Sequence, residues 1–97
     1  MLAYHTQGEV IYWRYAGYSP PGAEEIGRAF AQLSGYALED TPYASGFAGY
    51  KDWYISAFER PGYTMECGLG VNPLPITQFE DIYRANLPVL VFGALVT

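Results

Sequence analysis

The stretch from residue 19 to residue 36, SPPGAEEIGRAFAQLSGY, gives the clearest secondary-structure signal in the chain. Two prolines and a pair of acids stand at its start and a glycine follows its last turn, which is the usual order at the ends of an α-helix. Ile26, Phe30 and Leu33 recur at spacings of four and three, which predicts one buried face. Gly27 weakens the pattern slightly, because glycine has a low helix propensity.

Strand-like segments lie on both sides of this helix. Before it, the sequence predicts a strand over 1–5 and an irregular aromatic loop over 6–18. After it, the sequence predicts a short extended piece from 37 and a glycine-rich loop leading to a helical turn at 52–58. A strand over 63–67 and a helix from 77 follow. Thr77 and Glu80 match a capping box for the last helix, which Pro88 is expected to end or kink. This alternation predicts an α/β fold in one domain over residues 1–97.

Composition excludes several classes of protein. With 97 residues, 51% apolar and 15% charged, the chain can form one small domain and is not disordered. A net charge of −5 with five Lys and Arg argues against nucleic acid and anionic membranes as partners. The apolar tail over 87–96 is too short to span a bilayer and is predicted to be a buried helix or strand. The ten tyrosines suit a ligand groove or the rim of a small core equally well.

The cysteine content bears on location. Cys67 is the single cysteine and cannot form an internal disulfide, and no basic-then-apolar signal segment is visible at the start of the chain. Both observations favour a cytoplasmic protein. The thiol itself is expected to be a small buried group rather than a redox centre.

Two polar residues each follow an apolar strand. His5 ends the first predicted strand and Glu66 lies at the end of the second, 61 positions later (66 − 5). Ligands of open α/β sheets bind outside the carboxyl ends of strands, so the two groups could share one site. An imidazole suits zinc and a carboxylate can act as a general base. On spacing alone, a hydrogen-bonded structural histidine and a surface or ion-paired glutamate are the more common explanation, because H-x-x-E, C-x-x-C and G-x-S-x-G motifs are all absent.

Three motifs in a fixed order carry a resemblance to a known family. YHTQGEVIYW (4–13) and SGFAGYKDWYISAFERPGYTMECG (45–68) resemble the segments of carboxypeptidase A-like zinc peptidases that carry the third zinc ligand and the catalytic glutamate. Asp52 precedes Glu66 by 14 positions (66 − 52), which fits the spacing of that family. GLGVNPLPITQFEDIY (68–83) looks like the bacterial branch that cleaves γ-D-glutamyl–diaminopimelate bonds in cell-wall peptides.

The resemblance implies a mixed sheet flanked by helices and a set of site residues. His5 matches the third zinc ligand and Glu66 matches the general base that activates the attacking water. Tyr43 matches the substrate-binding tyrosine of a mobile loop, although one extra residue separates it from the Asp-Trp pair. Lys51 and Thr64 match positions that line the side-chain pocket. A cation at position 51 would suit the second carboxylate of diaminopimelate, whereas the alternative is a solvated loop lysine.

The chain also departs from the family pattern. The H-x-x-E zinc motif and the substrate-binding arginines of the family have no counterpart here, so the chain resembles the C-terminal half of the catalytic domain. One histidine is too few for zinc, which takes at least three protein ligands, so we expect zinc in the complete enzyme and neither tight binding nor activity in this chain alone. The expected partners are the N-terminal half, a second copy and a cell-wall peptide. The alternative is a non-catalytic α/β remnant that oligomerises or binds peptide without metal.

Overall fold

A mixed four-stranded sheet forms the centre of the protein in the computed structural model, which describes residues 1–96. The strands are β1 (Leu2–His5), β2 (Val10–Tyr12), β3 (Ala37–Glu39) and β4 (Tyr63–Glu66). Their order across the sheet is β1-β4-β2-β3. β1 runs parallel to β4 and β2 parallel to β3, whereas β2 and β4 are antiparallel.

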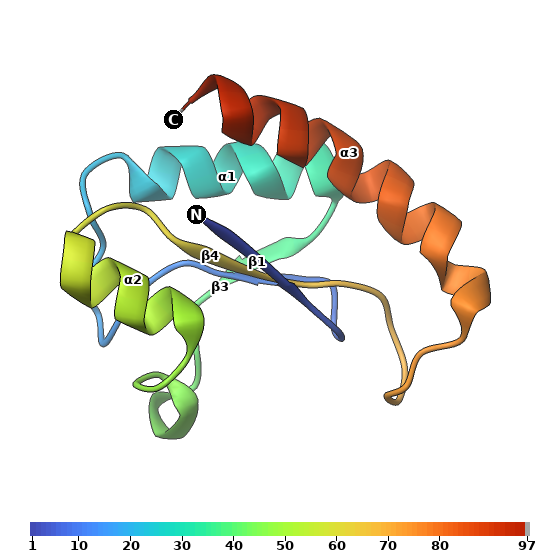
Figure 1. Cartoon of the computed structure of the whole chain (residues 1–97), viewed down its shortest axis with the longest axis horizontal. Coiled ribbons are helices and arrows are strands. Elements are labelled where there is room, and N and C mark those ends of the chain that lie inside the picture. Colours follow the sequence, from blue (N-terminus) through green and yellow to red (C-terminus); the bar gives the residue numbers. More distant parts are fainter. Residues whose placement is uncertain (97) are drawn as a thin grey trace.

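Helices cover both faces of the sheet. The helices are α1 (Ala23–Ser34), α2 (Tyr50–Phe58) and α3 (Phe79–Leu95), with short 3₁₀ turns η1 (Tyr43–Ser45) and η2 (Ile76–Gln78). Figure 1 shows α1 and α3 together on one face and α2 on the other. The predicted α/β fold is therefore confirmed. Within residues 1–96, no helix combines the length and the hydropathy needed to cross a membrane.

The main core lies between the sheet and the α1–α3 layer. Its buried side chains include Ile11, Phe30, Tyr63, Met65 and Val89. The Phe30 ring meets the rings of Tyr63 and Phe92 edge-on, with centroids 5.0 and 5.8 Å apart. The Tyr63 hydroxyl donates a hydrogen bond of 2.7 Å to the Ala23 carbonyl, and burial raises the pKa of this phenol. Strand β4 is thus fixed to the first turn of α1.

The predicted helix forms, although its buried face differs by one residue. Gly35 ends α1 with a φ of 79°, as the sequence predicted. Leu33, expected inside, is 41% exposed, whereas Ala23, Gly27 and Phe30 are buried. A Cβ at Gly27 would lie 3.0 Å from a Leu38 methyl group. The glycine that weakened the helix signal therefore lets α1 lie close to the sheet.

Three local predictions need correction. The segment 6–18 is not all loop, because Val10–Tyr12 forms β2 between β4 and β3. The capping box is wrong, since α3 begins at Phe79 with no side-chain cap and Glu80 pairs instead with Arg84. Of the two outcomes expected for Pro88, an end or a kink, only the end is wrong, because Pro88 lies inside α3, which is bent along its length in Figure 1. The carbonyl that loses its hydrogen bond belongs to exposed Arg84, so water can reach it.

Candidate strand-end active site

His5 and Glu66 are neighbours across the sheet. The parallel pairing of β1 with β4 sets His5 directly opposite Glu66. Paired residues of adjacent strands project from the same face, so the imidazole and the carboxylate share one face at the carboxyl ends of both strands. His5 is exposed and Glu66 half-buried. The register sets these two strand-end residues at paired positions, while a shared site and their chemical roles stay predictions.

Thr64 lies on the same face as this pair. It precedes Glu66 by two residues and is paired with Ala3 on one side and Tyr12 on the other. Residues of β4 alternate between faces, and Tyr63 and Met65 point into the core below α1 and α3. Thr64 and Glu66 therefore project toward the α2 side of the sheet.

The chain leaving β4 makes a tight turn directly after this pair. Gly68 adopts a φ of +76° and its carbonyl accepts a hydrogen bond of 2.7 Å from the Gly8 amide. The Gln78 side chain is bonded to both backbone groups of Leu69, at 3.1 Å from the amide and 2.8 Å from the carbonyl. The turn is thereby fixed both to the segment after β1 and to the start of α3.

We expect Gly68→Ala to lower the free energy of unfolding by about 1–3 kcal/mol. An added Cβ would lie 2.5 Å from a Leu74 methyl carbon and 2.8 Å from Oε1 of Gln78, and the positive φ adds strain. Gly35→Ala is the matched control, because Gly35 has a φ of +79° and no neighbour within 4 Å of such a Cβ. Urea unfolding of both variants measures the difference. Equal losses would show that the close packing at Gly68 has no energetic consequence.

Lys51 is buried at the start of α2. The residue is 3% exposed, so the alternative of a solvated loop lysine is wrong. Its ammonium group donates to the Arg14 carbonyl, to Oγ1 of Thr41 at 3.1 Å and to Oδ1 of Asp52 at 2.6 Å. The other carboxylate oxygen of Asp52 accepts the Gly49 amide at 3.0 Å. All three hydrogens of the ammonium thus have partners within this chain.

Tyr43 lies apart from the strand-end pair. Its side chain is 83% exposed on η1 and meets the Phe47 ring edge-on at 5.1 Å. Together with Arg14 and Thr41 these rings line an open hollow of about 340 Å³. Among the contacts described for residues 1–96, none joins Tyr43 to His5 or Glu66.

Sequence reasoning did not single out Arg14, which lies at this hollow. Its guanidinium donates to the Gly17 carbonyl at 2.6 Å and lies 3.4 Å from the Asp40 carboxylate. It also lies over the Trp13 ring, 5.3 Å from the centroid. The sequence shows an arginine within an aromatic loop, which could have marked Arg14 as a candidate binding residue. It does not show that position 14 lies beside position 43.

The Cys67 thiol points away from the candidate site into the core. It is 3% exposed, and burial raises its pKa. The expectation of a small buried group is confirmed. The Asn86 amide nitrogen lies 3.6 Å from this sulfur and donates to Oη of Tyr36 at 3.0 Å, while burial raises the pKa of Tyr36 to about 12. The sequence analysis did not single out Asn86. It lies between apolar residues in α3, and its partners Tyr36 and Cys67 are 50 and 19 positions away in the sequence.

The residues at the strand ends supply only part of a zinc site. Within residues 1–96, no three His, Cys, Asp or Glu side chains come together in a way that could hold a metal ion. The potential donors at the ends of β1 and β4 are the imidazole of His5 and the carboxylate of Glu66. Since zinc takes three or more protein ligands, these two groups do not fit the ion without further ligands.

Known proteins resemble the chain over nearly its whole length. The γ-D-glutamyl-L-diamino acid endopeptidase 1 of Lysinibacillus sphaericus is 45% identical over 93 residues, which is 96% of this chain and 23% of that protein. The uncharacterised protein YqgT of Bacillus subtilis (strain 168) is 42% identical over 90 residues, 93% of this chain and 24% of that protein. The chain thus spans about a quarter of the length of these curated relatives. No model of a protein family matches it.

Proposed function

We propose that the chain is part of a metallopeptidase that hydrolyses γ-D-glutamyl–diaminopimelate bonds in cell-wall peptides. The observation that carries the proposal is the pairing of His5 with Glu66 at the open ends of β1 and β4. The name of the Lysinibacillus relative, which is similar over 96% of this chain, supports the substrate class. Similarity to the carboxypeptidase A-like group is part of the same proposal.

Glu66 would act as the general base. Its carboxylate takes a proton from the attacking water and later gives that proton to the leaving amine. His5 would hold zinc together with ligands that lie outside these residues. When bound, zinc would polarise the scissile carbonyl and lower the pKa of a water. Within this chain, the sheet register keeps the base and the imidazole at adjacent positions.

Three further residues would bind the substrate. Thr64 would line the side-chain pocket from the same sheet face as Glu66. Tyr43 would reach the substrate from the exposed η1 turn. Lys51 would pair with the second carboxylate of diaminopimelate if its ammonium exchanged the Thr41 hydroxyl, its partner at 3.1 Å, for the ligand.

A chimera tests the proposal. The 93-residue matching segment of the Lysinibacillus endopeptidase is replaced by this chain, and products from a γ-D-glutamyl–diaminopimelate peptide are identified by mass spectrometry. We expect cleavage at the γ-glutamyl bond, its loss on chelation and its return with added zinc. A folded chimera that leaves the peptide intact, under conditions where the parent enzyme cleaves it, would contradict the proposal.

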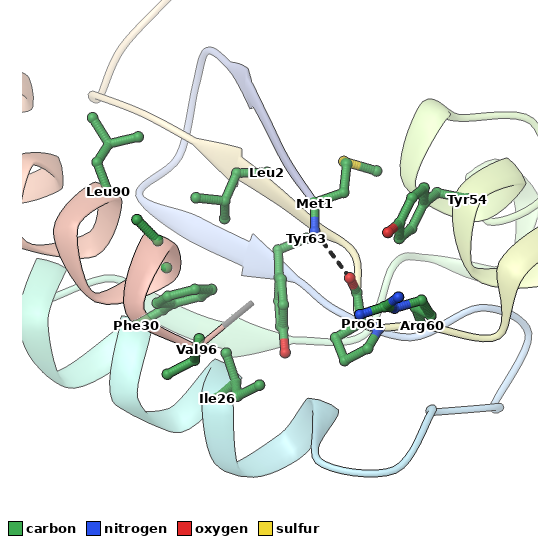
Figure 2. Close-up of a pocket in the computed structure, with 12 residues that line it drawn as sticks. Met1, Leu2, Ile26, Phe30, Tyr54, Arg60, Pro61, Tyr63, Leu90 and Val96 are labelled. Carbon is green, nitrogen blue, oxygen red and sulfur yellow. Dashed lines mark hydrogen bonds between the residues drawn. The ribbon is translucent and has the colours of Figure 1, made fainter.

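The free edge of β1 would be covered in a longer protein. β1 is an outer strand, and no strand lies on its far side within residues 1–96. Beside its start lies a hollow of about 260 Å³, lined mostly by apolar groups such as Leu2, Phe30, Tyr63 and Leu90. Figure 2 shows how these side chains lie. We propose that a further segment covers this edge, since the relatives are about four times longer.

Alone, the chain is expected to self-associate through the same edge, because unpaired strands and apolar hollows favour pairing of copies. Leu90→Glu should shift the chain toward the monomer in sedimentation velocity, because Leu90 is half exposed at the rim of the hollow. Ile76→Glu is the control, since Ile76 is an exposed apolar residue on η2 that does not line this hollow. A monomeric parent chain at all concentrations would show that the edge needs no cover.

A further inference from the structure

We propose that Asn72 is a positioning residue that keeps His5 beside Glu66. The catalytic role of that pair rests on the proposed function. The Thr6 hydroxyl donates to Oδ1 of Asn72 at 2.7 Å, and Nδ2 of Asn72 donates to the Thr6 carbonyl at 3.1 Å. The two residues lie 66 positions apart in the sequence. We refer to this reciprocal pair of bonds as the Thr6–Asn72 clasp.

The clasp completes a row of bonds that begins at the strand ends. The Cys67 amide donates to the His5 carbonyl at 2.8 Å, and the Gly8 amide donates to the Gly68 carbonyl at 2.7 Å. The chains leaving β1 and β4 therefore stay paired beyond their strands. Thr6 directly follows His5, so bonds to its hydroxyl and carbonyl restrict the backbone that carries the imidazole.

The loop that carries Asn72 has a second attachment. Gln78 holds Leu69 through two hydrogen bonds, which fixes the loop to the start of α3. Asn72 then joins this fixed loop to the segment after β1. The imidazole at the end of the outer strand is thereby tied to the helix layer by way of Leu69 and Asn72.

An amide suits this position better than its closest replacements. It offers a donor to the Thr6 carbonyl and an acceptor to the Thr6 hydroxyl at the same time. Asn72→Asp keeps the acceptor and loses the donor. Asn72→Leu keeps a similar shape and loses both, so the two variants form a graded series.

Nuclear magnetic resonance of the 97-residue chain tests the inference. His5 is the single histidine, so its ring signals are unambiguous. In Asn72→Leu we expect exchange of the Gly8 amide to rise on the order of tenfold, which is the scale of losing one or two modest hydrogen bonds. Contacts between the His5 ring and the Glu66 side chain should weaken, and Asn72→Asp should give a smaller change. Thr77→Ala, a nearby exposed substitution, should change neither readout.

Two results would overturn the inference. One is an unchanged Gly8 exchange rate and unchanged His5 ring contacts in Asn72→Leu. The other is an equal rise in exchange for core amides such as those of Ile11 and Phe30, which would mean that Asn72 supports the whole fold. In the active chimera, Asn72→Leu should lower kcat more than it changes KM. An inactive parent chimera would count against the proposed function and leave the exchange result standing.

Discussion

Lys51→Met is expected to lower the free energy of unfolding by about 3–5 kcal/mol, the usual cost of removing one partner of a buried ion pair. Both side chains of the Lys51–Asp52 pair are 3% exposed, so the Asp52 carboxylate would stay buried without its counter-charge. The Arg14 carbonyl and the Thr41 hydroxyl would lose the same donor. Methionine keeps most of the volume, so the loss reports the charge and its hydrogen bonds. Urea unfolding followed by tryptophan fluorescence measures it.

Two further variants separate the causes. Lys51→Met combined with Asp52→Asn removes both charges and keeps an oxygen for the Gly49 amide, so part of the stability should return. Arg84→Met removes one partner of an exposed pair with Glu80, whose side chains are 73% and 70% exposed, and should cost little. If Lys51→Met cost no more than Arg84→Met, the buried Lys51–Asp52 pair would contribute no more to stability than an exposed pair does.

The parts of the fold that follow from local signals were predictable. α1 has acids in its first turn, a glycine at its end and apolar residues at helical spacing, all within one segment. β1 and β4 are apolar segments that stop at His5 and Glu66. Since parallel strands expose their carboxyl ends at one edge, the sequence alone indicates that these two residues could lie in one site.

The missed features depend on partners far along the chain. β2 has only three residues and forms because β4 and β3 lie on either side of it. The burial of Lys51 depends on the Arg14 carbonyl, 37 positions away, and the clasp joins residues 66 positions apart. The capping box at Thr77 failed for a similar reason, because η2 and the Gln78–Leu69 bonds determine where α3 begins. The spacing of residues along the sequence does not reveal such long-range contacts.

The catalytic role of Glu66 leads to the other large expected effect. In the active chimera, Glu66→Gln should lower kcat by about 10²–10⁴-fold, the range that general-base catalysis contributes. Glutamine keeps the shape and the strand register opposite His5 and Val10, but its amide cannot take a proton from water. The loss should fall on kcat more than on KM, because the base acts in the chemical step rather than in binding.

Glu39→Gln is the matched control for this prediction. It makes the same chemical change on β3, the outer strand at the other edge of the sheet. Glu39 is exposed there and pairs with Tyr12 of β2, so turnover should be unchanged. Urea unfolding of both variants excludes a difference in stability as the cause. Near-normal turnover of Glu66→Gln would reject Glu66 as the base, and peptide cleavage would then have to depend on another group. A hundredfold loss confined to Glu66→Gln would instead tie hydrolysis to the one carboxylate that the β1–β4 register sets beside the imidazole.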